Sequence, residues 1–205
     1  MNPRPQPATS MPKTRRIGAA DAPASLIYLD TSPDHWTPLT AHLHQRLDGR
    51  IAQITYPPLV PKAPWASRGL TSALDAVFAE APGARVLVAA SHTAFPVLCW
   101  VASSPRRAAA ISGLVLFDPA TAAPTMLASL DLDRLRTVPT WLITTTPDDT
   151  NGARRAREWA DLLWADHDVI TGTGQHPSST YTERVAGPIL AALQVAHDAL
   201  LREGA

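Results

Sequence analysis

The chain has 205 residues with 18 basic and 18 acidic side chains, so its formal net charge is zero. Without excess positive charge it has no electrostatic basis for holding nucleic acid or an anionic membrane, and we expect neither partner. Its length suits one α/β domain, since a chain of this size folds without a metal or a disulfide. The single cysteine, Cys99, excludes an intrachain disulfide and a cysteine-based zinc cluster. It also fits a reducing compartment, so we expect a cytoplasmic protein.

No targeting or membrane-spanning segment is expected. Residues 1–24 contain five prolines, few large apolar side chains and no usable period, which predicts a disordered leader and not a secretory signal. Residues 86–105 contain no charged side chain and are long enough to cross a bilayer. However, the histidine, the threonine and the three serines within them favour a buried strand, a sharp turn and a buried helix.

Residues 25–205 alternate short apolar runs with helical periods, as expected for a single α/β domain. The apolar, β-branched runs predict six strands: 25–30, 50–56, 85–91, 113–118, 140–146 and 167–171. Apolar residues at a period of 3.6 predict helices, which together with their capping residues span 34–47, 67–78, 94–102, 151–164 and 185–200. This alternation predicts right-handed βαβ units in a doubly wound, mainly parallel sheet of about six strands.

The ligand of such a sheet lies beyond the carboxyl ends of its strands, so the residues at those ends matter most. No glycine-rich dinucleotide or phosphate-binding motif follows any predicted strand, and no nucleotide cofactor is indicated. Instead Ser91, Asp148 and His176 occur in this order, each after a later strand. A serine, an acid and a histidine in that order are typical of α/β-hydrolases.

Residues 86–94 (VLVAASHTA) resemble the strand, nucleophile elbow and helix start of the α/β-hydrolase superfamily. Three later stretches resemble the strand after the elbow helix, the acid turn and the histidine loop of that superfamily: 111–120, 138–149 and 169–177. Residues 32–36 (SPDHW), and a connection between Pro119 and Val138 that is too short for a lid, are similar to small lidless hydrolases related to the retinoblastoma-binding serine hydrolase.

The resemblance implies a serine hydrolase that cleaves an ester, a thioester or a similar acyl bond of a small molecule, with no cofactor and no metal. It implies that Ser91 is the nucleophile, that His176 is its base and that Asp148 orients the base. Asp118 is the alternative acid, because some relatives place the acid after the preceding strand. Two backbone N–H groups must stabilise the oxyanion, and the resemblance assigns them to His92 and Ser32: these residues stand where the superfamily has its oxyanion hole.

The sequence departs from the superfamily pattern at several positions. Ala89 and Thr93 replace the glycines on either side of the elbow, and the branched Thr93 is expected to crowd a close backbone approach. Asp30 brings a negative charge near the expected oxyanion hole, and His176 arrives one residue late in its loop. Two other functions therefore stay open, namely a non-catalytic binding protein and a cofactor-free lyase or cyclase that uses His176 as base.

The pocket walls are expected to come from loops at the same edge of the sheet. Residues expected to line the pocket are Asp30, Thr31, Trp65, Thr93 and Phe95.

Overall fold

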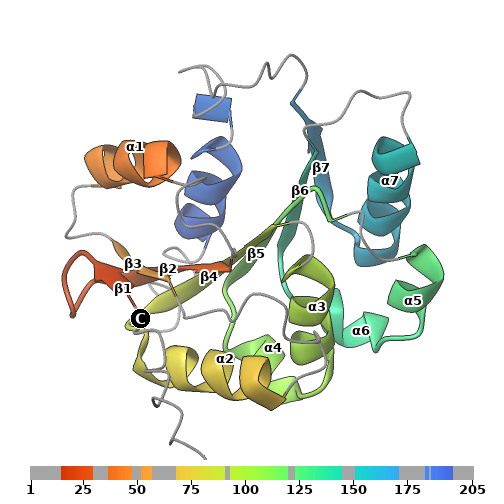
Figure 1. The fold of residues 1–205 in the computed structure, drawn as a ribbon, viewed down its shortest axis with the longest axis horizontal. Coiled ribbons are helices and arrows are strands. Elements are labelled where there is room, and N and C mark those ends of the chain that lie inside the picture. Colours follow the sequence, from red (N-terminus) through yellow and green to blue (C-terminus); the bar gives the residue numbers. More distant parts are fainter. Residues whose placement is uncertain are drawn as a thin grey trace, which may run out of the picture.

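A computed structural model describes residues 15–29, 37–47, 52–56, 68–90, 93–119, 123–144, 151–170, 183–184 and 186–195. Its strands form one twisted sheet in the order β1-β3-β2-β4-β5-β6-β7 (Figure 1). The strands are β1 (Arg15–Ile17), β2 (Ala24–Leu29), β3 (Ala52–Tyr56), β4 (Ala84–Ala90), β5 (Gly113–Phe117), β6 (Thr140–Thr144) and β7 (Asp166–Val169). The helices are α1 (Thr37–Leu47), α2 (Arg68–Glu80), α3 (Ala94–Ala102), α4 (Pro105–Ala109), α5 (Pro124–Ala128), α6 (Leu132–Leu135) and α7 (Asn151–Leu163). Residues 186–195 form a further helix.

Among the described strands, β2 to β7 are parallel to one another, and β1 at the edge runs antiparallel to β3. The predicted mainly parallel, doubly wound sheet is therefore confirmed, and each of the six predicted strands overlaps an observed one. Within residues 86–105 the structure has the expected strand up to Ala90 and the expected helix from Ala94 to Ala102, and the expected turn at residues 91 and 92 lies outside the described residues. In the part of the chain that the structure describes, no helix is long and apolar enough to span a membrane.

The chain changes direction across the sheet at β2. From β2 it crosses to β3 on one side, and from β3 it crosses back over β2 to reach β4 on the other side. Helix α1, which follows β2, and helix α3, which follows β4, accordingly pack in different cores on opposite faces of the sheet. In doubly wound sheets this point is where a crevice for a ligand opens.

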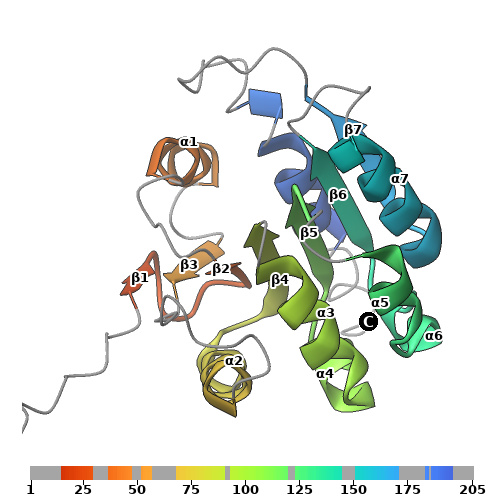
Figure 2. The same ribbon diagram turned by 45° about the vertical axis from the view of Figure 1, so that its right-hand side comes forward.

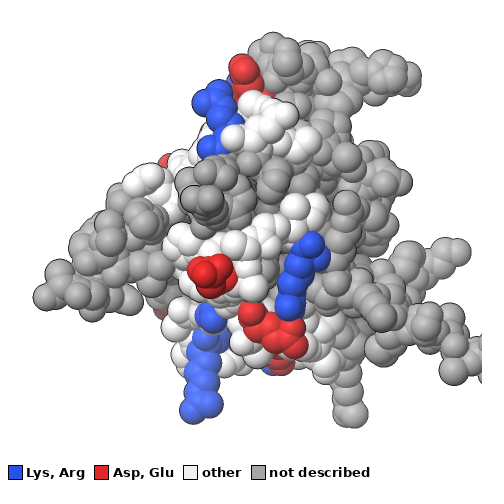
Figure 3. Space-filling view, turned by 90° about the vertical axis from the view of Figure 1, so that its left-hand side faces the viewer, with Lys and Arg blue, Asp and Glu red and all other residues white. Residues whose placement is uncertain are grey.

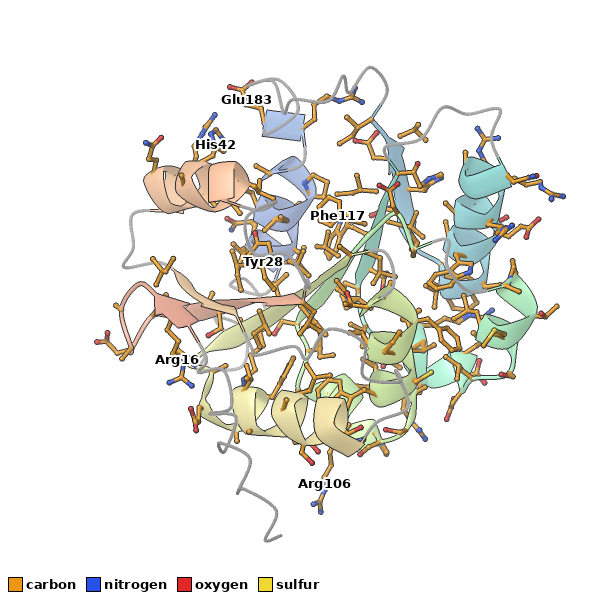
Figure 4. All side chains as sticks on the ribbon, viewed as in Figure 1. Arg16, Tyr28, His42, Arg106, Phe117 and Glu183 are labelled. Atoms are coloured by element: carbon orange, nitrogen blue, oxygen red, sulfur yellow. The ribbon has the colours of Figure 1, made fainter. Side chains whose placement is uncertain are left out.

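Side chains of the parallel strands alternate between two cores, as extended backbone requires. One core joins Leu29, Leu87 and Leu116 to helices α2, α3 and α7. The other joins Tyr28 and Phe117 to α1 and residues 186–195. Figures 1 and 2 show α1 and residues 186–195 on one side of the sheet and α2 and α3 on the other. Figure 4 shows Tyr28 and Phe117 on the side that carries residues 186–195.

Two segments differ from the sequence prediction. Arg15–Ile17 form β1 within the predicted disordered leader 1–24, because Ile17 pairs with Ile54 and packs on the core. The connection between Pro119 and Val138, for which the sequence predicts no helix, contains α5 and α6, which bury Leu127 and Leu135 in the core shared with α3 and α7. Residues 1–14 of the predicted leader lie outside the described residues.

The described surface is of mixed charge. On the face shown in Figure 3, basic and acidic side chains lie near one another. Elsewhere on the molecule, Arg16 and Glu80 form an ion pair between β1 and α2.

Candidate active site

The candidate site lies where β2 and β4 are neighbours. These strands pair in register with Leu29 beside Ala89, so their carboxyl ends lie side by side. Asp30 follows β2 directly, and Ser91 follows β4 directly. The candidate nucleophile is thus the residue that follows the described strand at the switch point of the sheet.

Most of the predicted site residues lie outside the described residues. They are Ser91, His92, Asp148, His176, Asp30, Thr31, Ser32 and Trp65. The three predicted triad residues nevertheless belong to connections that leave the same edge of the sheet, after β4, β6 and β7, because these strands are parallel. Thr93, Phe95 and Asp118 are described, and they define the surroundings of the elbow.

Thr93 links three backbone segments at the elbow. Its Oγ1 accepts a hydrogen bond from the Ala90 N–H at 3.0 Å. The same hydroxyl lies 2.8 Å from the carbonyl oxygens of Leu29 and Ala90, and it donates its one proton to them. The side chain is 7% exposed. The expected crowding by Thr93 is therefore replaced by hydrogen bonds that join the end of β4, the end of β2 and the start of α3.

Ala89 occupies the other position at which the superfamily has glycine. Its side chain is fully buried and belongs to the core shared with α2 and α3. A single methyl group at this position thus adds packing on the face of the sheet that carries α2 and α3.

Phe95 supports the first turn of α3 from inside the core. It is 6% exposed, and its ring centroid lies 6.4 Å from that of Trp159 on α7, with the two planes tilted by 56°. Such tilted pairs are a favourable aromatic arrangement. Among the described residues the buried Trp159 Nε1 has no hydrogen-bond partner. In the described structure Thr93 thus contacts the ends of β2 and β4, and Phe95 contacts Trp159 on α7. The sequence pattern indicated Trp159 only as part of a helix, and not as a neighbour of the start of α3.

Asp118 follows β5 in a left-handed conformation. Its φ is 42°, which is uncommon for a residue with a Cβ although Asp tolerates it better than most. Its backbone N–H donates to the Ile143 carbonyl at 2.9 Å, and its side chain is half-buried. Asp118 directly follows Phe117, which pairs with Ala90 at the end of β4. Strained backbone of this kind recurs at functional sites.

The described residues provide no alternative metal or thiol chemistry. No group of three or more histidine, cysteine, aspartate or glutamate side chains among them could hold a metal ion. Burial raises the pKa of the Cys99 thiol, which keeps it protonated and weakly nucleophilic.

Comparisons with known proteins agree on the fold. No protein-family model matches this sequence, and no curated protein matches it significantly. Among solved structures, a carboxylesterase of the thaumarchaeon Nitrososphaera gargenis is 11% identical, with a TM-score of 0.58 over 91% of this chain and 97% of its own. The monoacylglycerol lipase of Paleococcus ferrophilus is 13% identical, with a TM-score of 0.57 over 89% of this chain and 98% of its own. The thioesterase domain from the curacin biosynthetic pathway is 13% identical, with a TM-score of 0.57 over 89% of this chain and 93% of its own.

The sheet order, the helices on both faces and these similarities define the class of fold. The chain has the α/β-hydrolase fold, with its switch point between β2 and β4. At 11 to 13% identity the solved structures establish this fold and no more.

Proposed function

We propose that this protein is a serine hydrolase that cleaves an ester, thioester or similar acyl bond of a small molecule. The observation that carries the proposal is the position of Ser91, directly after β4 at the switch point, where Thr93 ties the ends of β2 and β4 to α3. The similar solved structures, a carboxylesterase, a monoacylglycerol lipase and a thioesterase domain, support the same class of reaction.

The reaction needs a base, an acid that orients it and an oxyanion hole. In this proposal His176 takes the proton of Ser91 Oγ as that oxygen attacks the substrate carbonyl carbon, and Asp148 holds the imidazole in the correct tautomer. The oxyanion accepts hydrogen bonds from the backbone N–H groups of His92 and Ser32, each worth on the order of a hundredfold in rate.

The intermediate then collapses and is hydrolysed. The bond from the carbonyl carbon to the leaving group breaks, and His176 returns its proton to the departing alcohol or thiol. Water, deprotonated by His176, attacks the acyl-enzyme, releases the carboxylic acid and restores the hydroxyl of Ser91. Every proton that His176 accepts in this cycle is returned, so the reaction consumes only the substrate and one water.

We also propose that the enzyme is lidless, like the small hydrolases related to the retinoblastoma-binding serine hydrolase. The connection from β5 to β6 supports this, because its helices α5 and α6 bury Leu127 and Leu135 in the main core. These helices therefore belong to the packed body of the domain.

A fluorophosphonate probe tests the proposal, because it reacts with an activated serine. We expect labelling of the wild type, loss of labelling in Ser91→Ala, and loss of hydrolysis of a p-nitrophenyl ester by about a thousandfold or more in Ser91→Ala and in His176→Ala. Ser129→Ala is the matched control, since this surface serine bonds only the nearby Met126 carbonyl in the described structure.

The circular dichroism spectrum shows whether each variant is folded. A folded wild-type protein that neither reacts with the probe nor hydrolyses acyl esters and thioesters contradicts the proposal. That result favours a binding protein, or a lyase or cyclase whose activity depends on His176 but not on Ser91.

A further inference from the structure

Only one asparagine of this chain is followed by a residue whose backbone nitrogen can attack its side chain. The chain has two asparagines: Asn2 precedes Pro3, and Asn151 precedes Gly152. An asparagine loses its side-chain amide without any enzyme when the nitrogen of the next residue attacks the amide carbon. Proline has no N–H and cannot complete this reaction, whereas glycine has one and, without a Cβ, hinders the attack least. The sequence therefore restricts this reaction to Asn151.

Asn151 stands where a helix holds its backbone least firmly. It is the first residue of α7, and its side chain is exposed. For the attack, the backbone of Asn151 must rotate out of the helical conformation until the Gly152 nitrogen meets the side-chain carbon. Inside a helix this rotation breaks several hydrogen bonds, but the first four N–H groups of a helix have no partner within it. Helix ends also open more readily than helix interiors, so the first turn of α7 permits the rotation.

The charges near Asn151 favour both the attack and its product. Arg154 Nη2 donates a hydrogen bond to Asn151 Oδ1 at 3.4 Å. Negative charge develops on this oxygen as the Gly152 nitrogen adds to the amide carbon, and a cation beside the oxygen stabilises that charge. The first turn of α7 contains no acid. The partial positive charge at the amino end of the helix therefore favours a new carboxylate at residue 151.

We propose that Asn151 is a site of spontaneous deamidation, which places a carboxylate at the amino end of α7. The Gly152 nitrogen bonds to the side-chain carbon of Asn151, the bond from that carbon to the amide nitrogen breaks, and ammonia leaves with the proton of Gly152. Water then opens the cyclic imide and restores the Gly152 N–H. The reaction consumes one water and releases one ammonia, and nothing is oxidised or reduced. It does not depend on the proposed hydrolase function.

The imide opens at either of its two carbonyl carbons, and the two products affect α7 differently. Opening at the main-chain carbonyl gives isoaspartate, which adds a methylene group to the main chain and interrupts the first helical turn. Opening at the side-chain carbonyl gives aspartate, which keeps the main chain and pairs its new charge with Arg154 and the helix dipole. Because α7 follows β6, the change occurs at the edge of the sheet that carries the candidate site.

Peptide mass spectrometry of protein stored at physiological temperature tests the proposal. Trypsin releases residues 137–154, in which Asn151 is the only asparagine. We expect this peptide to gain about 1 Da with storage, and fragmentation to place the gain at Asn151. The gain should be faster at mildly alkaline than at mildly acidic pH, because the attacking nitrogen must lose its proton. A sample digested without storage gives the starting value, and Asn2 in the same digest should stay unchanged.

Gly152→Ala is the matched variant, since alanine suits a helix better than glycine and its Cβ hinders the attack. It should slow the reaction by about tenfold or more, with a circular dichroism spectrum like that of the wild type. Asn151→Asp represents the aspartate product, and its urea midpoint should lie above that of the wild type.

Three results would contradict the proposal. If Asn151 stays intact in the folded protein while a synthetic peptide of residues 146–156 deamidates, the first turn of α7 protects it. If Gly152→Ala reacts as fast as the wild type, the Gly152 nitrogen is not the attacking group. If Asn151→Asp has a lower urea midpoint than the wild type, the amino end of α7 does not favour a carboxylate.

Discussion

The hydroxyl of Thr93 does at the elbow what a glycine cannot do. A glycine at this turn lets two backbones approach, but it leaves the Ala90 N–H without a side-chain partner. Thr93 fills the space, accepts from that N–H and donates to the Leu29 and Ala90 carbonyls. Threonine in place of glycine thus adds hydrogen bonds between the start of α3 and the ends of β2 and β4.

Replacing Thr93 separates its shape from its hydrogen bonds. Thr93→Val keeps the shape but leaves the Ala90 N–H without this partner at a buried position, so we expect a loss of about 2 kcal/mol in the free energy of unfolding. Thr93→Ser keeps the hydroxyl and should lose about 1 kcal/mol or less. Urea denaturation followed by tryptophan fluorescence measures both values, and a valine variant as stable as the serine variant would show that the hydroxyl is unimportant.

Sequence patterns could indicate that residue 93 stands at a tight turn, but not what its side chain does there. The acceptor on Leu29 is 64 residues away in the sequence, and nothing local to Thr93 marks it. The left-handed φ of Asp118 was equally hidden, because the Asp-Pro pair at 118–119 indicates a turn without fixing its conformation. Such details depend on which strands become neighbours in the sheet.

At the scale of elements, Asp75 holds helices α2, α3 and α4 together. Its Oδ1 accepts hydrogen bonds from Trp100 Nε1 at 2.9 Å and from Arg107 Nε at 3.0 Å, and its Oδ2 accepts one from Arg107 Nη2 at 2.7 Å. The Arg107 guanidinium also lies over the Trp100 ring, 5.4 Å from its centroid. One carboxylate thus fixes the packing of three helices on the same face of the sheet.

This cluster predicts a pH-dependent contribution to stability. The hydrogen bond from Arg107 is the main cause that lowers the pKa of Asp75 below its ordinary value, although burial opposes it. A lowered pKa in the folded state means that the stabilisation is present above the unfolded-state pKa of about 3.9 and is lost as the pH falls through the lower folded-state value. Because the Asp75 side chain is 46% exposed, solvent screens the pair.

We therefore expect Asp75→Asn to destabilise the protein by on the order of 1 kcal/mol at neutral pH, with a smaller difference from the wild type in acid. Asp133→Asn is the control, since Asp133 is 97% exposed and lies 3.4 Å from Arg136. Chemical denaturation at neutral pH and below the ordinary carboxyl range gives the two differences. Equal losses in the two variants, or a loss from Asp75→Asn that does not shrink in acid, would contradict this role.

Helices and strands could be predicted from the sequence where their run of apolar residues was long enough to show a helical or strand period. The strand and helix at 84–90 and 94–102 follow from an apolar run that changes character at Ser91. Helix α7 follows from its apolar row, all of which is buried in the structure: Ala156, Trp159, Ala160 and Leu163. Strand β1 has three residues and depends on pairing with β3, so no local pattern indicates it. Helices α5 and α6 have five and four residues, too few to show a helical period.

At the scale of the whole molecule, helices must cover both faces of the sheet. One of these helices, residues 186–195, approaches β5 very closely. Gly113 begins β5, and a Cβ built there would lie 3.2 Å from the Ala192 Cβ and 3.3 Å from Trp141 Cζ3. Ala192 belongs to residues 186–195, which pack on the face of the sheet opposite α3 and α7. The absence of a side chain at Gly113 therefore lets the last described helix approach β5.

A double-mutant cycle tests whether this contact sets the packing of that helix. Gly113→Ala should lose about 1 to 3 kcal/mol in the free energy of unfolding, because the added methyl group overpacks the contact. Ala192→Gly should lose about 1 kcal/mol through its lower helix propensity. In the double variant the second change removes the methyl group that the first one meets, so the combined loss should be smaller than the sum by about 0.5 kcal/mol or more. Strictly additive losses in urea denaturation would show that residues 186–195 do not rest on β5 at this contact, and the core on that face of the sheet would then need a different arrangement.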